Sequence, residues 1–412
     1  MQFKDVIGQQ AMQHHLLAMV QQNRLSHAML FLAREGSGGL SMALAFAQYV
    51  VCDKVQNKQN QANANASLFN FDIPPEPQTI NLPAGQAGDK RQTDSCGECP
   101  SCIKAAKLIH PDIHFSYPVI PKKSGDKPIS TDYITEWREF VKLYPYGNAF
   151  DWLQFIGAEN KQGNITAEEC NDIIHKLSLK SFESGYKILV MWMPEYLGKE
   201  GNKLLKLIEE PPPNTLFILV AENDEQLLPT ILSRCQLIRI PLLTPEAIKQ
   251  ALIQRAGAGP EAAEQISGIT EGNYREALQL LQHTEEDWTS LLSDWLKFTI
   301  RKMLPEQVKW ILDVHELGRE KQKQLLLYFN HLLEQSIRLK VIGDQLALPA
   351  KEKDFAQRLN KIASVSQQQV IIEELDKAVY YIERNANAKM LFHALTIKLY
   401  HIIQDKALIL TN

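Results

Sequence analysis

Apolar residues in the first part of the chain occur in short, unbroken runs separated by helix-like segments. Three such runs lie at residues 28–32, 188–191 and 216–221, and the second gives a strand candidate at 187–191 that starts with Lys187. Strands that are buried on both faces, as in a parallel sheet, have this continuous apolar pattern. Residues 41–50 form a helix-like stretch, and Thr166 with Glu169 gives the capping-box pattern of a helix at about 166–180. The alternation predicts an α/β domain with a mainly parallel sheet over residues 1–242.

From about residue 243 the pattern becomes helical only. Thr244, Pro245 and Glu246 begin one helix, with proline in its first turn, and a second helix begins near Gly272. Further along, apolar residues recur at helical spacing in Ile371/Ile372, Leu375, Ala378/Val379 and Ile382. We therefore expect a helical domain over 243–292 and an all-α domain over 293–412, the latter serving to pack within the chain or against other subunits.

Two segments interrupt the α/β pattern. Residues 53–95 hold polar runs, an Asn/Ala repeat and several prolines, so they have too little apolar content to pack and are predicted to be a disordered insertion. The second segment, at about 120–162, contains the aromatic residues Trp137, Phe140, Tyr144, Tyr146, Phe150 and Trp152. This density indicates either a packed subdomain or a docking surface, and packing is the favoured interpretation.

Composition narrows the class of protein. The chain has 412 residues and a net charge of −4, which excludes a strongly basic nucleic-acid binder. No apolar stretch is long enough to span a bilayer, and the polar start of the chain is not a signal peptide. Six cysteines in so long a chain do not make a disulfide framework, and Cys170 and Cys235 are expected to be small buried apolar residues. A soluble, cytoplasmic protein is expected.

The other four cysteines form a candidate metal site. Cys96, Cys99 and Cys102 have C-x2-C-x2-C spacing, and Cys52 can supply a fourth ligand from the end of the helix at 41–50. Four thiolates with no open position are typical of structural zinc. An iron–sulfur cluster, whose ligands can be similarly spaced, and reduced free thiols are the alternatives.

The turn after the first apolar run matches the frame of a phosphate-binding loop, G-x-x-x-x-G-K-[ST], but lacks its chemistry. Ala33 stands at the first glycine, Gly39 at the lysine, and Leu40 at the Ser/Thr that holds magnesium. The remnant of the loop consists of Gly36, Ser37, Gly38 and Gly39. Its backbone N–H groups can still attract an anion, but nothing pairs the terminal phosphates or the metal.

The acidic partner of such a loop is also missing. An aspartate that binds the metal is expected where the strand at 187–191 ends, yet the only acidic residue there is Glu195. Two separate parts of a nucleotide site have been lost together. The sequence therefore predicts no functional ATP site and no hydrolysis by the chain alone.

Several segments together resemble a known family. They are 3–9 (FKDVIGQ), 24–28 (RLSHA), 110–112 (HPD) after the cysteines, 204–212 (LLKLIEEPP), 228–236 (LPTILSRCQ) and, more weakly, 385–387 (NAN) with Lys389. The chain resembles the clamp-loader branch of the AAA+ proteins, and within it the delta-prime subunits of bacterial DNA polymerase III. These subunits commonly lack the lysine and the acidic strand end.

The resemblance implies an AAA+ domain with an embedded zinc module, then a helical lid domain and a helical collar. It implies that Arg234, with Ser233 and Cys235, is an arginine finger that acts on a neighbour's ATP site; the alternative is a structural arginine that closes a helix end. Arg275 matches the family's second nucleotide-sensing arginine, although a structural role is favoured. His27 and His110 are expected to be structural.

The implied assembly is a hetero-oligomeric ring with gamma/tau-type ATPases and a delta subunit. It would load a sliding clamp onto primer–template DNA, which this chain would contact mainly through the complex, without any membrane. One alternative is an active gamma/tau-type ATPase subunit, which Gly39 and Leu40 contradict. Another is a zinc-dependent nucleic-acid-binding module, which would need basic and aromatic residues around Cys96–Cys102 that this sequence lacks.

Overall fold

The computed structural model describes residues 1–57, 93–123, 125–158, 163–282, 288–343, 350–384 and 386–405. The chain forms two compact units, Met1–Gln279 and Leu280–Asn412. Each unit has its own buried core, so each is described by itself.

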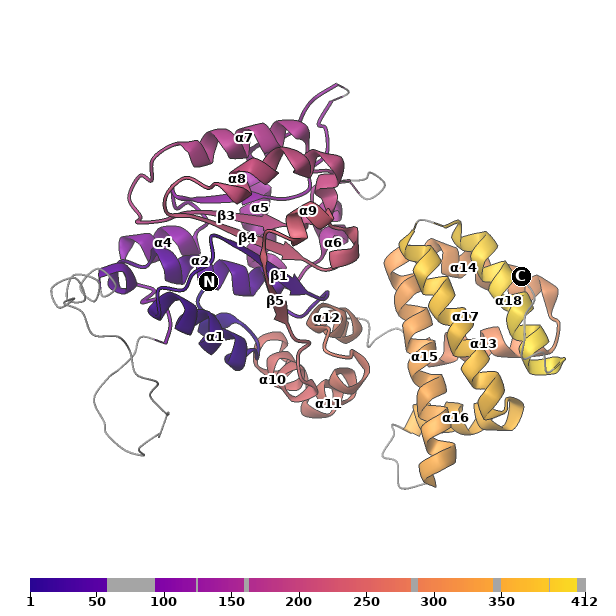
Figure 1. Ribbon diagram of the computed structural model, residues 1–412. Coiled ribbons are helices and arrows are strands. Elements are labelled where there is room, and N and C mark those ends of the chain that lie inside the picture. Colours follow the sequence, from indigo (N-terminus) through magenta and orange to yellow (C-terminus); the bar gives the residue numbers. More distant parts are fainter. Residues whose placement is uncertain are drawn as a thin grey trace, which may run out of the picture. The chain divides into compact units, whose positions relative to one another are not determined.

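A five-stranded sheet forms the centre of the first unit (Figure 1). Its strands are β1 (Ala28–Ala33), β2 (Ile113–Ser116), β3 (Lys187–Trp192), β4 (Thr215–Ala221) and β5 (Gln236–Ile240). They lie in the order β2-β3-β4-β1-β5, and every pairing is parallel. The three predicted strands are confirmed as the inner three, β3, β4 and β1. The parallel α/β architecture is therefore as expected.

Helices surround this sheet. They are η1 (Phe3–Asp5), α1 (Gln10–Gln21), α2 (Gly39–Val51), α4 (Pro100–Ala106), η2 (Ser130–Tyr133), α5 (Ile134–Leu143), α6 (Ala149–Phe155), α7 (Ala167–Ser178), η3 (Pro194–Leu204), α8 (Leu205–Glu209), η4 (Asp224–Gln226), α9 (Pro229–Leu232), α10 (Pro245–Ala256), α11 (Pro260–Ile269) and α12 (Tyr274–Gln282). The η segments are 3-10 helices. Among the described residues no helix has both the length and the apolar character needed to cross a bilayer.

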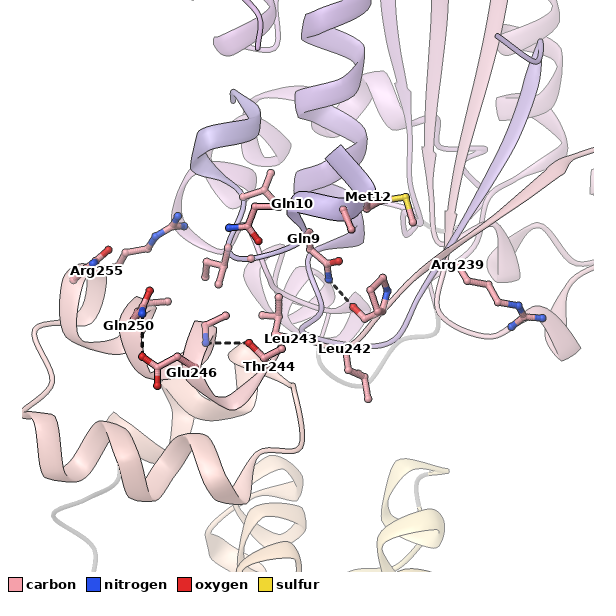
Figure 2. A pocket seen from close by; sticks show the side chains of 18 residues that line it. Gln9, Gln10, Met12, Arg239, Leu242, Leu243, Thr244, Glu246, Gln250 and Arg255 are labelled. Atoms are coloured by element: carbon pink, nitrogen blue, oxygen red, sulfur yellow. Dashed lines mark hydrogen bonds between the residues drawn. The ribbon is translucent and has the colours of Figure 1, made fainter. Parts of the chain in front are cut away.

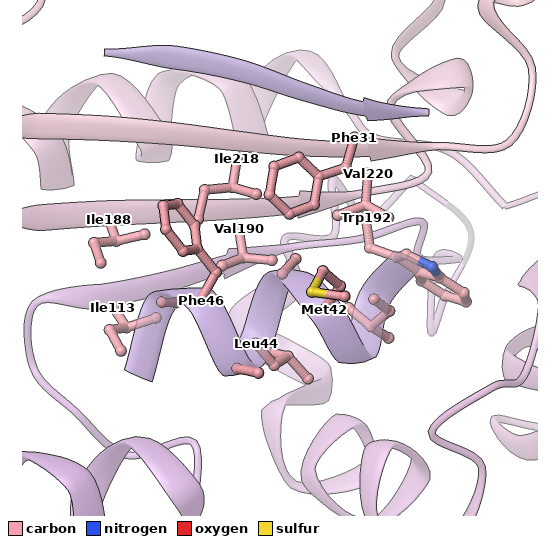
Figure 3. Close-up of a cluster of buried hydrophobic side chains, with 14 of the residues drawn as sticks. Phe31, Met42, Leu44, Phe46, Ile113, Ile188, Val190, Trp192, Ile218 and Val220 are labelled. Carbon is pink, nitrogen blue, oxygen red and sulfur yellow. The ribbon is translucent and has the colours of Figure 1, made fainter. Parts of the chain in front are cut away.

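Alternate residues of the inner strands point to opposite faces of the sheet, and both faces are covered. On one face, α2 packs against the strands in a cluster that includes Phe31, Val190, Ile218, Met42 and Phe46 (Figure 3). On the other face the buried residues include Leu30, Leu189, Leu219, Ile173 of α7 and Ile208 of α8. This three-layer packing fixes the end of β1 and the start of α2 inside the core.

The aromatic segment at 120–162 is part of the main core. Trp137 and Phe140 of α5 and Trp152 of α6 are at most 1% exposed. The rings of Trp137 and Trp192 of β3 have centroids 5.2 Å apart. These contacts support packing over docking as the task of most of the aromatics, although Tyr144 remains 49% exposed.

Of the two hydrogen bonds of the predicted capping box, the start of α7 forms the one that Thr166 accepts. Thr166 Oγ1 accepts a hydrogen bond from Glu169 N at 3.1 Å, as expected. The Glu169 carboxylate does not return to the cap; it accepts from Ser130 N at 2.6 Å, and burial raises its pKa. The Glu169 carboxylate thus pairs with a backbone donor that is distant in sequence, because the buried Ser130 N–H would otherwise have no hydrogen-bond partner.

The second unit is entirely helical in its described part. Its helices are α13 (Trp288–Ile300), α14 (Leu304–Glu316), α15 (Arg319–Ile342), α16 (Ala350–Ile362), α17 (Val365–Glu383) and α18 (Ala388–Gln404). Trp295 stacks on Trp310 at 4.6 Å in the core. The predicted stripe of α17 is confirmed, since Ile371, Leu375, Ala378 and Ile382 are all buried.

Two predicted boundaries need correction. The limit at residue 293 falls inside α13, whose Trp288 and Leu292 belong to the core of the second unit. Of the insertion at 53–95, residues 58–92 lie outside the described part, but its flanks are ordered. Asp94 accepts hydrogen bonds from Phe3 N and Lys4 N, both at 3.0 Å, and so is held against η1.

Candidate functional site

The phosphate-loop frame is present as a strand, a glycine turn and a helix. β1 ends at Ala33 in the middle of the sheet, and α2 begins at Gly39. Gly36 has φ of 69° and Gly38 has φ of 92°, a left-handed region that favours glycine. The backbone shape of the loop has therefore been kept although its lysine and hydroxyl have been lost.

The two departures at Ala33 and Gly39 depend on each other. A Cβ atom added at Gly39 would lie 2.4 Å from Ala33 Cβ and 3.1 Å from Val220 Cγ1. Neither neighbour has a flexible end that could move away. As long as alanine occupies position 33, position 39 cannot carry any side chain, and so cannot carry lysine, without displacing the strand.

Side chains from the aromatic segment fill the space in front of this loop. The cavity that remains there has a volume of about 20 Å³, which is room for about one water molecule. Tyr146 lies over Gly38, where an added Cβ would meet its ring at 2.7 Å. The Tyr146 hydroxyl accepts a hydrogen bond from Ile7 N at 2.7 Å, and burial raises its pKa to about 12. Side-chain packing therefore leaves little room in front of the loop.

The hydrogen bonds of Glu195 are made to the segment after β4 and not to the phosphate loop. Its Oε1 accepts hydrogen bonds from Glu222 N at 2.6 Å and Asn223 N at 2.9 Å, and burial raises its pKa. The carboxylate thereby holds the backbone that follows β4. Its geometry supports a structural role for the only acidic residue at the end of β3.

Arg275 lies at the start of α12 with its side chain 5% exposed. Its Nη2 donates to Asp151 Oδ1 at 2.7 Å and its Nη1 to Glu35 Oε1 at 2.9 Å. Two carboxylates of the same chain therefore bind this guanidinium. The sequence analysis did not single out Asp151 or Glu35, because only the fold brings them to Arg275; the Asn148–Asp151 spacing signals no more than a helix cap.

The pair at positions 33 and 39 can be tested by a double-mutant cycle. Gly39→Ala is expected to cost about 1–3 kcal/mol of unfolding free energy, the usual range for overpacking. Adding Ala33→Gly should recover part of that cost, because it removes the atom that the new Cβ meets. Chemical denaturation of the four proteins measures the coupling, and costs that simply add would contradict the contact.

Restoring the loop chemistry should not create an ATPase. Gly39→Lys combined with Leu40→Thr is expected to show no ATP hydrolysis above background, since Tyr146 fills the site and the acidic strand end is missing. A phosphate-release assay measures this. Hydrolysis that appears with the two substitutions would show that only the lysine and the hydroxyl had been lacking.

The structure brings the four predicted metal-binding cysteines together. The sulfur atoms of Cys52, Cys96, Cys99 and Cys102 all lie within 4.8 Å of one another. Those of Cys96 and Cys102 are 3.8 Å apart, close to the edge of about 3.8 Å expected for a tetrahedron of thiolates around zinc. Cys52 is the C-cap of α2 and Cys99 is the N-cap of α4, so the cluster joins the helix after the phosphate loop to the cysteine-rich turn.

Backbone N–H groups prepare these sulfurs for a metal. Cys96 N, Cys99 N and Cys102 N point at cysteine sulfurs at 3.3–3.4 Å. An N–H group directed at a sulfur atom stabilises its thiolate form. The thiolate is the form that binds metals, so the donor set fits a closed four-thiolate site. Of the other two cysteines, Cys170 is buried as expected and Cys235 only half-buried.

Arg234 follows α9, one-third exposed. Its Nη1 donates to Thr230 O at 2.8 Å, which satisfies a carbonyl at the end of α9. Its Nε and Nη2 face the Glu209 carboxylate at the end of α8. The same side chain is thus both reachable from solvent and engaged within the chain.

The two predicted structural histidines differ in how they are held. The His110 ring is buried, its Nδ1 accepts a hydrogen bond from Asp112 N at 3.1 Å, and burial lowers its pKa. His27 contributes its backbone oxygen, which accepts from Phe217 N at 2.7 Å. The contacts of the His110 ring support a structural role, whereas His27 is held through its backbone and its side chain is exposed.

A wider cavity of about 800 Å³ lies between residues 6–12 and the segment from β5 into α10 (Figure 2). Gln9 closes one side, because its side-chain amide donates to Pro241 O. The lining includes none of residues 34–40. The cavity therefore has the volume of a ligand pocket but no phosphate cradle of its own.

Comparison with known proteins places the chain. The family described as "DNA polymerase III, delta subunit" matches residues 8–74 and 82–244, more than half of the sequence. The chain belongs to this family. The matched region contains β1, the phosphate-loop remnant, the cysteine cluster and Arg234.

Individual relatives agree with this assignment. DNA polymerase III subunit delta' of Bacillus subtilis is 24% identical over 65% of this chain and 57% of its own length. The delta' subunit of Haemophilus influenzae is 27% identical over 55% of this chain and 59% of its own. A gamma subunit from Buchnera aphidicola is 25% identical over 44% and 51%. The chain thus spans little more than half the length of these relatives.

Proposed function

We propose that this chain is a delta-prime-type subunit of a DNA polymerase III clamp loader that neither binds nor hydrolyses ATP. The single observation that carries the proposal is the phosphate loop of a family member whose space is filled by Tyr146 and whose position 39 is blocked by Ala33. Packed side chains occupy the space in front of this loop.

The proposed role within the loader is that of a fixed subunit beside ATPase subunits. The first unit corresponds to an AAA+ domain with α10–α12 as its lid, and the helical second unit to a collar that joins the ring. The gamma/tau-type ATPases, a delta subunit, the sliding clamp and primer–template DNA are the proposed partners. An active gamma/tau-type subunit is the alternative, and the Buchnera relative named gamma supports it at the level of family only.

Zinc is the proposed occupant of the four-cysteine cluster. The sulfur separations and the N–H groups directed at the thiolates support a structural ion that joins α2 to α4. Bound there, the metal would supply cross-linking of two chain segments and no reaction chemistry, since four thiolates leave no open position.

Arg234 is the proposed arginine finger. A guanidinium stays charged and presents a planar fork suited to phosphate oxygens, so it can stabilise the charge that develops in a neighbour's ATP site. Its one-third exposure supports this role. To act in trans it must exchange Glu209 for a phosphate, which a negatively charged nucleotide across an interface can bring about.

Affinity capture from the cells that make the protein tests the proposal. A tagged chain is expected to recover the gamma/tau and delta subunits and the sliding clamp, identified by mass spectrometry. The purified chain should hydrolyse no ATP, while the recovered complex should do so when clamp and primed DNA are added. Capture without any loader subunit would reject the proposed function.

A further inference from the structure

Residues 145–151, which run from the link after α5 into the first turn of α6, lie directly on the phosphate-loop remnant. Ser41 Oγ, in the first turn of α2, donates to Pro145 O at 2.8 Å. Tyr146 is held by Ile7 N and lies so close to Gly38 that an added Cβ would meet its ring at 2.7 Å. The segment thus occupies the approach to the start of α2, where N–H groups would otherwise face an anion.

The same segment carries the carboxylate that binds Arg275. Asp151 Oδ2 and Oδ1 accept from Arg275 Nε at 2.5 Å and Nη2 at 2.7 Å, which is a two-pronged contact. Glu35, inside the loop remnant, accepts from Nη1 at 2.9 Å. A guanidinium that is 5% exposed requires an anion, and a phosphate would suit this fork as well as a carboxylate does.

The start of α12 completes the junction. Tyr274 N donates to Gly36 O at 3.2 Å. The rings of Tyr146 and Tyr274 meet edge to face, with centroids 5.1 Å apart. A Cβ on Gly36 would lie 1.8 Å from Asn273 Oδ1. The loop, residues 145–151 and α12 therefore contact one another pairwise.

We infer that residues 145–151 occupy the phosphate loop as a ligand that belongs to the chain itself. Tyr146 fills the space of the loop, and the Asp151 carboxylate binds Arg275 in the place of a bound anion. The start of α12 is thereby docked on the loop without any bound phosphate. Removing the carboxylate should uncover an oxyanion site at Arg275 for phosphate or pyrophosphate. The inference rests on contacts within the first unit alone and holds whether or not the chain joins a clamp loader.

Asp151→Ala tests the inference, with inorganic pyrophosphate as the probe. We expect the melting temperature of the first unit to fall by about 5–10 °C, since the buried guanidinium of Arg275 loses its two-pronged carboxylate contact and keeps the single contact with Glu35. Millimolar pyrophosphate should restore at least half of that loss, and sodium chloride of equal ionic strength should not. Amide hydrogen exchange at the start of α12 should quicken in the variant and slow again with pyrophosphate. The unsubstituted protein should respond to neither salt.

Asp151 also caps α6, so a control must separate the two roles. Asn148→Ala removes the reciprocal cap, in which Asn148 Oδ1 accepts from Asp151 N at 2.9 Å, and leaves Arg275 paired. This control should show a smaller fall in melting temperature, and pyrophosphate should not raise it. If Asp151→Ala fails to fold, Asp151→Asn keeps the size and the cap and removes the charge. The inference would be overturned if the Asp151 variants lost no more melting temperature than Asn148→Ala does. It would also be overturned if pyrophosphate failed to raise the melting temperature of either Asp151 variant specifically.

Discussion

Arg234→Ala is expected to lower ATP hydrolysis by a reconstituted clamp loader while this protein stays folded and joins the ring. An arginine finger contributes about 10³–10⁵ in rate at the site that it serves, and a ring with several sites should show a smaller total loss. Arg234→Lys should rescue poorly, because an ammonium group cannot make the planar two-pronged contact. Clamp- and DNA-stimulated ATP turnover in rings with normal and substituted subunits measures the effect.

The contacts of Arg234 provide the controls. If its task were only to close α9 and hold Glu209, Glu209→Ala would reproduce the defect; as a finger, Arg234 should remain active when Glu209 is removed. Arg239→Ala removes an arginine of the same unit that is 69% exposed, and it should leave turnover unchanged. Unchanged rates in intact Arg234→Ala rings would make Arg234 a structural residue.

Cys102→Ala is expected to release the proposed zinc and to destabilise the first unit strongly. Structural zinc sites contribute about 10–16 kcal/mol of binding free energy that is coupled to folding, so the melting temperature should fall by about 10 °C or more. The unsubstituted chain should carry about one zinc ion. Elemental analysis by mass spectrometry and thermal unfolding measure the two outcomes.

Cys170→Ala is the matched control, because Cys170 and Cys102 are both fully buried in helices and lose the same atom. This variant should keep its zinc, and its melting temperature should fall by about 2–4 °C, the usual cost of a small cavity. Cys52→Ala examines the fourth ligand and should release the metal as Cys102→Ala does. Full zinc content in Cys52→Ala would remove that cysteine from the site, and bound iron with visible absorbance would favour the cluster alternative.

The pattern of the sequence determined the elements whose burial is uniform. The inner strands β1, β3 and β4 are covered on both faces and therefore appear as unbroken apolar runs. The edge strand β5 was missed because only two of its five residues, Ile238 and Ile240, are buried. The helix α17 was found from its stripe, because apolar residues at helical spacing report one buried face.

Among the candidate sites, the sequence by itself determined which chemistry is missing and which residue types are available. The lost lysine, the lost hydroxyl and three of the cysteines can be read from spacing alone. Cys52 could only be suggested, since 43 residues separate it from the next cysteine; the fold places its sulfur among the others.

Only the tertiary structure decided what replaced the lost chemistry. Ala33 blocks Gly39 because a strand and a helix meet there, and Asp151 reaches Arg275 across a separation of 124 residues. Glu169 likewise leaves its own helix cap for Ser130. Contacts of this kind leave no periodic signal, because they depend on how the sheet, the helices and the aromatic segment pack around one another rather than on the spacing of neighbouring residues.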